Sequence, residues 1–476
     1  METSKTGLLD PYIPSPTKPW NKTLVTHLLN RTMFGATVSQ VNSVLALTPN
    51  EAVELLFQPY AAPEVPGTWV TEAPDFNSAY NTQRTSQLRT WWVRLMYEQP
   101  VSIREKMTLF WHNHFVSEAG TVIIPQYMYM QNTIFRNNCT GNFRTLAKLV
   151  TRDPGMLIYL DGRYNIVGNP NENYGRELHE LFTMGIGNYT ETDVREAARA
   201  LTGWILSGLG SIFVPSRHDY GNKTFLGQTG NFDDNDVIDI IFNQPVTAKF
   251  ICTKLYKTFI HQNDDLSYAQ PVIDEMANIL RSNNYEIAPL LKTLLKSKLF
   301  YSDNTISSLI KNPLDLMIGS VKMLNINFDP SSLTTRLNYI ITQASAAGQF
   351  ILDPPNVQGW VGYRQWLSTI SMPIRAAFAE SIITGLQKNG QPTGFSVDAL
   401  AFAMSFSAPN NAVQLVKDMT EHLLRLTVTP RQLNALLEIM LDGSLVMDWY
   451  INDPQAPSRI KKYLKALVNL AEFQIN

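Results

Sequence analysis

The chain has 476 residues, of which 44% are apolar and 17% are charged, and it carries a formal net charge of -2. A chain of this length buries most of its apolar surface on folding, so it needs no disulfides for stability. Its net charge is too small to create a strong field, which argues against nucleic acid or an anionic membrane as a ligand. The sequence contains no long uninterrupted apolar run, so we predict no membrane-spanning helix.

The two cysteines, Cys139 and Cys252, belong to no CxxC pair or Cys/His cluster, which argues against a structural zinc site. We expect two buried thiols; a disulfide between them stays open, because sequence alone does not give its geometry. The N-terminus shows no basic stretch followed by an apolar run, so no signal peptide is visible. The default expectation is therefore a cytoplasmic protein.

The N-terminal part begins with an irregular segment. Four prolines within residues 1–20 predict an extended arm, because proline biases the residue before it away from the helical region. Helical periodicity begins near Leu24, and a short amphipathic helix capped by Asn50 is predicted over 50–58. A proline-rich linker without clear periodicity follows over 60–79.

Longer helices are predicted after this linker. Apolar residues recur at helical spacing over 88–95 and stop before Pro100. Ser102 and Glu105 have the spacing of a capping box, so we predict that a new helix begins at Ser102. Helical periodicity continues over 121–160.

Residues 206–235 differ in character from the rest of the chain. Glycines separate short apolar pieces there, which predicts a small hairpin or a large loop. Helices return over 236–300 and again over 380–476. We therefore predict a mainly α, multi-helix globular protein with a small glycine-rich hairpin or loop insert. The expected domains are an extended arm, a main helical domain and a C-terminal helical region packed on it, over 1–20, 21–375 and 376–476.

The most informative segment runs from Asn169 to Trp204. It predicts a helix over about 170–184 that Gly185 ends, followed by a second helix that Thr190 and Asp193 start. The connection between the two helices is short, so we expect a tight helical hairpin.

Two glutamates of the first of these helices are candidates for chemistry. Glu177 and Glu180 share a face, so they could ligate one metal ion or act as an acid/base pair, whereas His179 lies away from them. Carboxylates suit hard cations, and an added imidazole would suit iron, manganese or zinc. The alternative is that Glu177 forms an ion pair with Arg195 or Arg199 of the next helix.

The helix predicted over 102–116 carries two histidines in an HxH pattern. Residues two apart lie on opposite sides of a helix, so His112 and His114 are not expected to bind one metal ion together. His114 lies on the apolar face and is most simply a hydrogen-bonded core histidine. The functional interpretation is that His114 faces Glu177 and completes a metal site between helices.

A turn is predicted at Asp161-Gly162. Asp161 and Asn165 either stabilise this turn or project into a pocket, because functional residues often lie on loops that a rigid scaffold holds.

The glycine-rich insert contains a third candidate group. His218 lies beside Asp219, which could orient it as a general base, and Lys223 could hold an anion. No GxSxG nucleophile elbow accompanies them. The alternative is a surface loop that its own polar groups hold in place.

A rigid turn with aromatic residues is predicted at DPPNVQGW, which ends at Trp360, with Trp366 after it. These tryptophans either close a core or stack, exposed, on a sugar or a partner. The chain has no Walker A, GxGxxG, HExxH or EF-hand motif, which disfavours nucleotide-dependent and zincin chemistry.

Taken together and in this order, several segments resemble the bacterial family called domain of unknown function 1800. They are HLLNRTMFGAT (27–37), WHNHF (111–115), YLDGRYN (159–165), NENYGRELHELFTMGIGNYTETDVREAARALTGW (171–204), HDYGNKTFLG (218–227) and DPPNVQGW (353–360). The family has no established activity. The resemblance implies a helical fold, export (although this chain shows no signal peptide) and a secreted sulfatase-like protein, encoded nearby, as a partner.

The leading hypothesis is an enzyme with a polar pocket formed by the segments 102–116, 159–165, 170–203 and 217–224. The candidate catalytic residues are Glu177, Glu180, His218 and Asp219. A divalent metal is the candidate cofactor, with His114 and Glu177 as ligands. The candidate substrate-binding residues are Asp161, Asn165, Asn173, Arg176 and Lys223.

The competing hypothesis is a non-catalytic helical scaffold that binds a partner protein or a cell-surface glycan. The enzyme requires that these polar groups converge in a concave pocket. The scaffold instead predicts exposed apolar or aromatic patches around Trp360.

Overall fold

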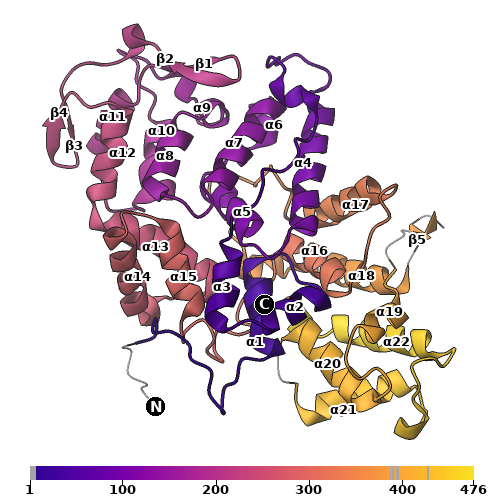
Figure 1. Cartoon of the computed structure of the whole chain (residues 1–476). Helices are drawn as coiled ribbons and strands as arrows, with labels where there is room; N and C mark the ends of the chain where they lie inside the picture. The colour runs from indigo at the N-terminus through magenta and orange to yellow at the C-terminus, as the bar shows by residue number, and fades with distance from the viewer. Residues whose placement is uncertain (1–6, 386, 389–390, 393–395, 426–427) are drawn as a thin grey trace.

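Short α-helices make up most of the chain in the computed structural model, which describes residues 7–385, 387–388, 391–392, 396–425 and 428–476 (Figure 1). This confirms the prediction of a mainly α protein. None of the described helices combines the length and the apolar character that a bilayer-spanning helix needs.

The helices fall into three successive groups along the chain. The first comprises α1 (Lys22–Thr32), α2 (Val38–Leu45), α3 (Pro49–Leu56), α4 (Asn81–Glu98), α5 (Arg104–His114), α6 (Ala119–Val122), α7 (Pro125–Asn137), α8 (Phe143–Thr151) and α9 (Pro154–Tyr159). The second comprises α10 (Asn173–Glu177), the π-helix η3 (Leu178–Thr183), α11 (Glu191–Ala200), α12 (Asp234–Asn243), α13 (Pro245–Phe259), α14 (Gln270–Ser282) and α15 (Ile287–Lys296). The third comprises α16 (Pro313–Met323), α17 (Leu333–Ala346), α18 (Ser371–Thr384), α19 (Ala399–Met404), α20 (Ala412–Leu424), α21 (Pro430–Leu441) and α22 (Ala456–Val468).

The predicted glycine-rich insert is present as two antiparallel hairpins. One pairs β1 (Trp204–Ser207) with β2 (Gly210–Phe213), and the other pairs β3 (Lys223–Phe225) with β4 (Gln228–Gly230). A further short pair joins β5 (Gln387–Lys388) to β6 (Gln391–Pro392).

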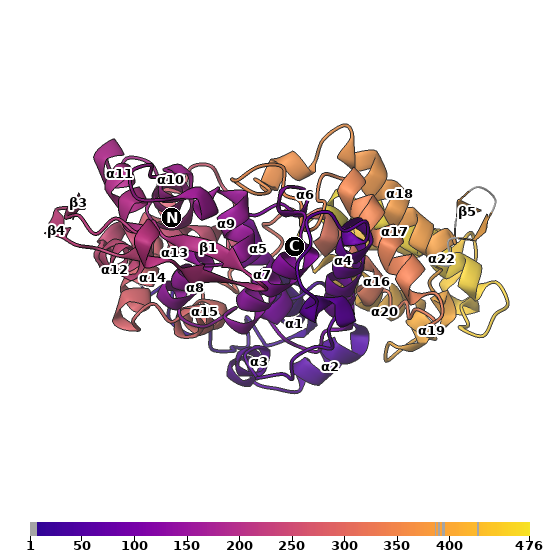
Figure 2. The same cartoon turned by 90° about the horizontal axis from the view of Figure 1, so that it is seen from above.

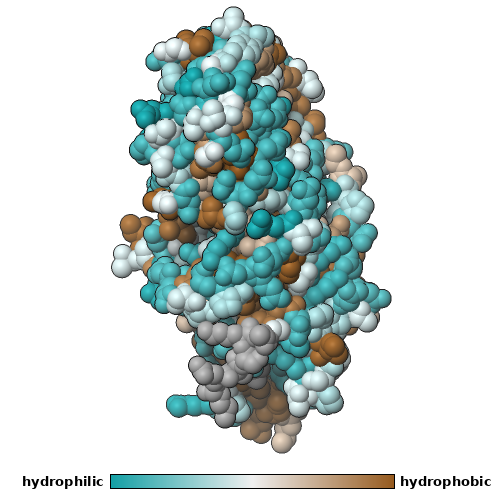
Figure 3. All heavy atoms as spheres, turned by 90° about the vertical axis from the view of Figure 1, so that its left-hand side faces the viewer, coloured by the Kyte–Doolittle hydropathy of each residue, from teal (hydrophilic) through white to brown (hydrophobic). Residues whose placement is uncertain are grey.

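The N-terminal helices lie between the other two groups. Seen from above, α8 and α11–α15 lie on one side, α16–α22 lie on the other, and α1–α5 fill the space between them (Figure 2). Hydrophilic side chains dominate the face that carries β3, β4, α12 and α14, and the hydrophobic ones on it are scattered (Figure 3). This face is therefore an ordinary solvated surface.

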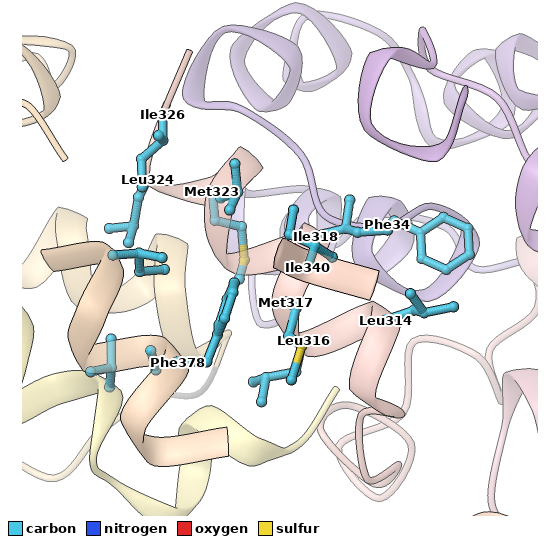
Figure 4. Close-up of a cluster of buried hydrophobic side chains, with 14 of the residues drawn as sticks. Phe34, Leu314, Leu316, Met317, Ile318, Met323, Leu324, Ile326, Ile340 and Phe378 are labelled. Atoms are coloured by element: carbon cyan, nitrogen blue, oxygen red, sulfur yellow. The ribbon is translucent and has the colours of Figure 1, made fainter. Parts of the chain in front are cut away.

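The buried apolar side chains form two clusters. One contains residues between Leu9 and Tyr301, and the other contains residues between Phe34 and Phe473. Every residue of α16 is buried, and its side chains lie between Phe34 on one side and Phe378 on the other (Figure 4). The clusters overlap along the sequence and do not by themselves set domain boundaries, so the division at residue 375 stays a prediction.

Two glycines allow the backbones after α1 and within α16 to touch. Gly35 has a φ of +78°, and a Cβ atom on it would lie 2.6 Å from the Cα atom of Gly319. A side chain at this position is therefore excluded by both conformation and space.

Residues 7–20 of the predicted arm form no helix and contain turns, such as the one closed by the Asp10 N–H and the Gly7 carbonyl oxygen (3.2 Å). Tyr12 is buried, and its N–H donates to the carbonyl oxygen of Lys296 at the end of α15 (2.7 Å). Residues 1–6 of the predicted arm lie outside the described residues. Cys139 and Cys252 are both free thiols.

Two predicted helix starts are wrong. Thr48, not Asn50, caps α3 in a capping box with Glu51. No capping box joins Ser102 to Glu105, because the buried Glu105 carboxylate instead forms an ion pair with Arg136 (2.8 Å).

The helix predicted over 170–184 begins three residues late. The Oδ1 atom of Asn165 accepts the N–H of Asn171, and Oδ1 of Asn171 accepts the N–H of Asn173, so these residues form a loop that precedes α10. The predicted capping box of Thr190 and Asp193 is confirmed at the start of α11.

Candidate functional site

A cavity of about 440 Å³ lies among α5, η3, α13 and the segment around 349–366. This volume suits a small-molecule ligand. The titratable groups in its lining are Arg31, Lys106, His114, Glu180, Lys254, Lys257 and Asp315. Its aromatic lining consists of Phe110, Phe250, Trp360 and Trp366.

A lysine and a histidine meet in the cavity wall. Lys254 Nζ lies 3.1 Å from His114 Nδ1 and 2.8 Å from the carbonyl oxygen of Leu181. His114 Nε2 lies 2.9 Å from the carbonyl oxygen of Phe182. A carbonyl oxygen only accepts, so Nε2 donates its hydrogen there and Nδ1 accepts from Lys254.

The π-helix η3 supplies the two carbonyl groups. The N–H groups of Met184 and Gly185 both donate to His179, which leaves the carbonyl oxygens of Leu181 and Phe182 without a helical partner. The last carbonyls of any helix need such outside partners, and π-turns frequently occur at functional sites. Lys254 and His114 therefore both cap η3 and line the cavity.

Burial favours the neutral form of both side chains. It lowers the pKa of His114 well below its ordinary value, and the neighbouring Lys254 lowers it further. Burial, with a smaller effect of Lys257, lowers the pKa of Lys254 to about 7. A substantial share of Lys254 is therefore the free amine near neutral pH, although its Nζ also lies 4.9 Å from the centre of the Phe250 ring.

Glu180 projects into the same cavity from η3. The Tyr189 hydroxyl donates to its Oε2 atom (2.9 Å), and burial together with Glu180 raises the pKa of Tyr189 to about 12. Glu180 forms no ion pair with any described residue. Its carboxylate is held in place while remaining free for a ligand.

Positive charge predominates in the lining. Lys106 is neutralised by an ion pair with Asp315, whereas Arg31 donates to carbonyl oxygens, including those of Phe259 and Thr305 (both 2.8 Å). Lys257 has no ion-pair partner within the described ranges. Among the described residues, Arg31 and Lys257 are therefore the positive charges of the lining without an ion-pair partner, and Glu180 is the corresponding negative charge.

More buried cations lie behind this wall. The residues 473–476 each accept one hydrogen bond from a buried cation, and the donors in that order are Lys311, Arg375, Arg425 and Arg31. Burial lowers the pKa of Arg31 to about 9 and that of Arg425 to about 10. The three arginines remain charged at neutral pH and add to the positive potential around the cavity, whereas burial lowers the pKa of Lys311 well below its ordinary value.

The family model described as "Protein of unknown function (DUF1800)" matches residues 27–475. The chain belongs to the DUF1800 family. No curated protein and no solved structure matches it. The residues matched by the DUF1800 model include the whole cavity lining except Asn476.

Two of the sequence-predicted site residues of this DUF1800 protein, His114 and Glu180, line the cavity. Glu177 does not line it; this side chain is half-buried, and burial followed by Glu180 raises its pKa. No hydrogen bond or ion pair to Glu177 occurs within the described residues. Arg199, its suggested partner, instead pairs with Asp219 (2.7 Å).

The remaining candidates of the helical hairpin and of the preceding turn bind other residues of the protein. Arg176 binds both carboxylate oxygens of Glu191 (2.8 Å each), and the exposed Asn173 lies 3.4 Å from Asp161 through Nδ2 and Oδ2. Asn165 is buried and donates to the carbonyl oxygen of Ala198 (2.8 Å). None of these predicted substrate-binding residues lines the cavity.

The candidate polar residues of the glycine-rich insert contact backbone carbonyl groups and a neighbouring arginine. His218 Nδ1 lies 2.9 Å from the carbonyl oxygen of Thr202, and Asp219 pairs with Arg199. Lys223 is buried and donates to the carbonyl oxygens of Asp219 and Phe232. These contacts match the alternative of a loop that its own polar groups hold, and they lie apart from the cavity lining.

The arrangement offers little to a metal ion. Both ring nitrogens of His114 already have partners, and Glu177 lies outside the lining. Within the part of the chain that the structure describes, no group of three or more His, Cys, Asp or Glu side chains is placed to share an ion.

Lys254 and Lys257, the two lysines that α13 brings to the cavity, were not predicted from the sequence. They lie three residues apart and therefore on one helical face, a spacing that is common on solvated helices. Only the fold shows that this face of α13 contacts His114 and η3.

Proposed function

We propose that the protein is an enzyme that binds a small anionic molecule in this cavity and uses Lys254 and Glu180 for proton transfer. The observation that carries the proposal is the hydrogen bond of the Lys254 amine to a neutral His114 in the wall of the cavity. A lysine whose pKa falls near neutrality is suited to general acid–base catalysis.

The proposed acid and base do not neutralise each other. Lys254 and Glu180 line one cavity, yet no ion pair joins them in the described part of the chain. Leu181 and His114 hold the amine, and Tyr189 holds the carboxylate. Each group is therefore available to a different part of a bound molecule.

The charge of the lining supports an anionic ligand. Arg31 and Lys257 lie in the wall without ion-pair partners among the described residues, and charges in a partly buried cavity attract an anion more strongly than they would in bulk water. We propose that Lys257 holds the anionic group of the substrate, while Arg31, whose terminal N–H groups bind carbonyl oxygens, contributes positive potential.

Turnover in a bacterial metabolite extract tests the proposal. The purified protein should consume at least one anionic metabolite, as measured by mass spectrometry, and Lys254→Met and Glu180→Gln should each slow this reaction by about 100-fold or more. The matched control is Lys249→Met on the same helix, because Lys249 forms a surface ion pair with Asp274. Equal turnover by wild type and by both cavity variants would contradict the proposal.

A second candidate function is the binding of a secreted sulfatase-like protein, the partner that the family resemblance implies. Trp360 and Trp366 are buried, so they offer no exposed platform for a glycan. The apolar side chains of Val361 and Ile370, however, are 60% and 73% exposed. We propose that these two side chains belong to the surface that contacts this partner.

A binding titration distinguishes this second candidate from the first. Ile370→Glu should weaken the complex with the sulfatase-like protein by about tenfold, whereas Lys254→Met should leave it unchanged. Identical binding by wild type and Ile370→Glu would contradict a role for this surface.

A further inference from the structure

We propose that the substrate is a carbonyl compound with a carboxylate or phosphate group, and that Lys254 Nζ forms an imine with its carbonyl carbon. This inference rests on the proposed function and names the substrate class of the same cavity.

The hydrogen bonds of Lys254 orient its lone pair. A neutral amine has two N–H bonds and one lone pair in a tetrahedral arrangement. Both polar partners of Nζ, the Leu181 carbonyl oxygen and His114 Nδ1, are acceptors, so they take both N–H bonds. No other hydrogen bond to Nζ occurs within the described ranges, and the residue lines the cavity. The lone pair is therefore available for attack on a bound molecule.

His114 is suited to hold the amine in this state. Its Nε2–H donates to the carbonyl oxygen of Phe182, which fixes the tautomer in which Nδ1 is an acceptor. A carboxylate in the place of this imidazole would favour the protonated ammonium, which is not a nucleophile. The fold instead supplies an uncharged acceptor at this position.

Lys257 supplies the second requirement, which is a charge near the nucleophile. It lies three residues after Lys254 on α13, lines the same cavity and forms no described ion pair. A second cation beside a lysine in an apolar environment is a known way to activate that lysine as a nucleophile. The same cation can bind the carboxylate or phosphate of the substrate.

The reaction balances without an oxidant or a reductant. The lone pair of Nζ forms a C–N bond, and the electron pair of the carbonyl π bond moves to the oxygen. One proton passes from nitrogen to this oxygen, which gives a carbinolamine. The C–O bond then breaks, a second proton from nitrogen leaves with the oxygen as water, and a C=N bond remains. Glu180 lies in the same cavity and can carry these protons.

Borohydride reduction tests the inference with defined probes. The intact protein is incubated with pyruvate, glyoxylate or dihydroxyacetone phosphate, reduced, digested and mapped by mass spectrometry. We expect saturable modification of Lys254 by at least one probe, at least about tenfold above that of the half-exposed Lys249. Lys257→Met should raise the concentration of probe needed for half-saturation about tenfold, because an anion contact is lost.

The outcomes separate this inference from the proposed function. No modification of Lys254 by any of the probes, or equal modification of Lys254 and Lys249, would overturn imine formation. If Lys254 is not modified but Lys254→Met abolishes turnover in the metabolite extract, the proposed proton transfer by Lys254 is retained and only imine formation is rejected. If turnover is independent of Lys254, the proposed function fails as well. Thermal unfolding of each variant shows whether it is folded.

Discussion

The Nζ atom of Lys254 lies 3.1 Å from Nδ1 of His114, so an amine and an imidazole, both bases, share one hydrogen bond in the wall of a cavity. Such a contact is favourable only when at least one of the two groups is neutral. Burial ensures this, because it lowers the pKa of His114 well below its ordinary value and that of Lys254 to about 7. The charge of this pair should therefore influence the stability of the protein as well as its chemistry.

The contribution of Lys254 to stability should increase with pH. Its pKa is about 7 in the folded protein against 10.5 in a model peptide, so between these values the unfolded chain binds one proton more than the folded protein. The free energy of unfolding therefore rises with pH in this range. Methionine binds no proton, so the difference between wild type and Lys254→Met should rise from about pH 7 to about pH 10 and be flat below pH 7.

Urea unfolding at a series of pH values measures this difference, with Lys249→Met as the matched variant. The groups that face Lys254 are Lys257, His114 and Glu180, and all are retained in both variants. A difference between wild type and Lys254→Met that is constant over the whole range would contradict the lowered pKa.

Local sequence patterns predict the fold better than the site. The spacing of Thr190 and Asp193 predicts a capping box, because both partners belong to one helical turn. The HxH pattern likewise predicts that His112 and His114 point apart, and His112 indeed packs against Trp92 while His114 lines the cavity.

The rest could not be predicted because it depends on contacts between distant segments. Lys254 and His114 lie 140 residues apart in the chain. Glu105 has the spacing of a capping residue, yet its ion pair with Arg136 on α7 takes it away from the helix start. In sequence, a polar residue of the insert such as Asp219 fits a catalytic site as well as it fits a structural ion pair. The structure shows the ion pair, with Arg199.

Asp153 should make the protein less stable as the pH rises. It caps α9 from a buried position, and burial raises its pKa from 3.8 to about 7. Between these values the folded protein binds one proton more than the unfolded chain, so the free energy of unfolding falls with rising pH. Asparagine can also cap a helix but does not ionise.

The variant Asp153→Asn should therefore gain about 2–4 kcal/mol relative to wild type between about pH 4 and pH 8. Denaturant unfolding at both pH values measures this gain. Asp398→Asn is the matched control, because Asp398 caps α19 from an exposed position. The same pH dependence in both variants would show that burial of Asp153 is not the cause.

Gly35→Ala should destabilise the contact between the end of α1 and α16. Its new Cβ atom would lie 2.6 Å from Cα of Gly319, in addition to the strain of a φ of +78°. Gly187→Ala separates the two effects, because Gly187 has a φ of +87° and nothing within 4 Å of a Cβ atom. We expect losses of about 3 kcal/mol or more for Gly35→Ala and about 1 kcal/mol for Gly187→Ala. Equal losses of unfolding free energy in the two variants would mean that the backbones at Gly35 and Gly319 can separate without an energetic cost.

Lys257 should depress the pKa of Lys254 in the free protein. The positive charge of Lys257 disfavours a second proton nearby, although burial is the larger cause of the low pKa. In Lys257→Met the pKa of Lys254 should therefore rise, by about one unit or less, and remain below its ordinary value. The rate at which acetic anhydride modifies Lys254, followed by peptide mass spectrometry across a pH series, measures this change, because only the free amine reacts. Lys249→Met should leave the midpoint of this profile in place, since Lys249 pairs with Asp274 at the surface. A midpoint that stays fixed or falls in Lys257→Met would show that burial alone sets the charge of Lys254.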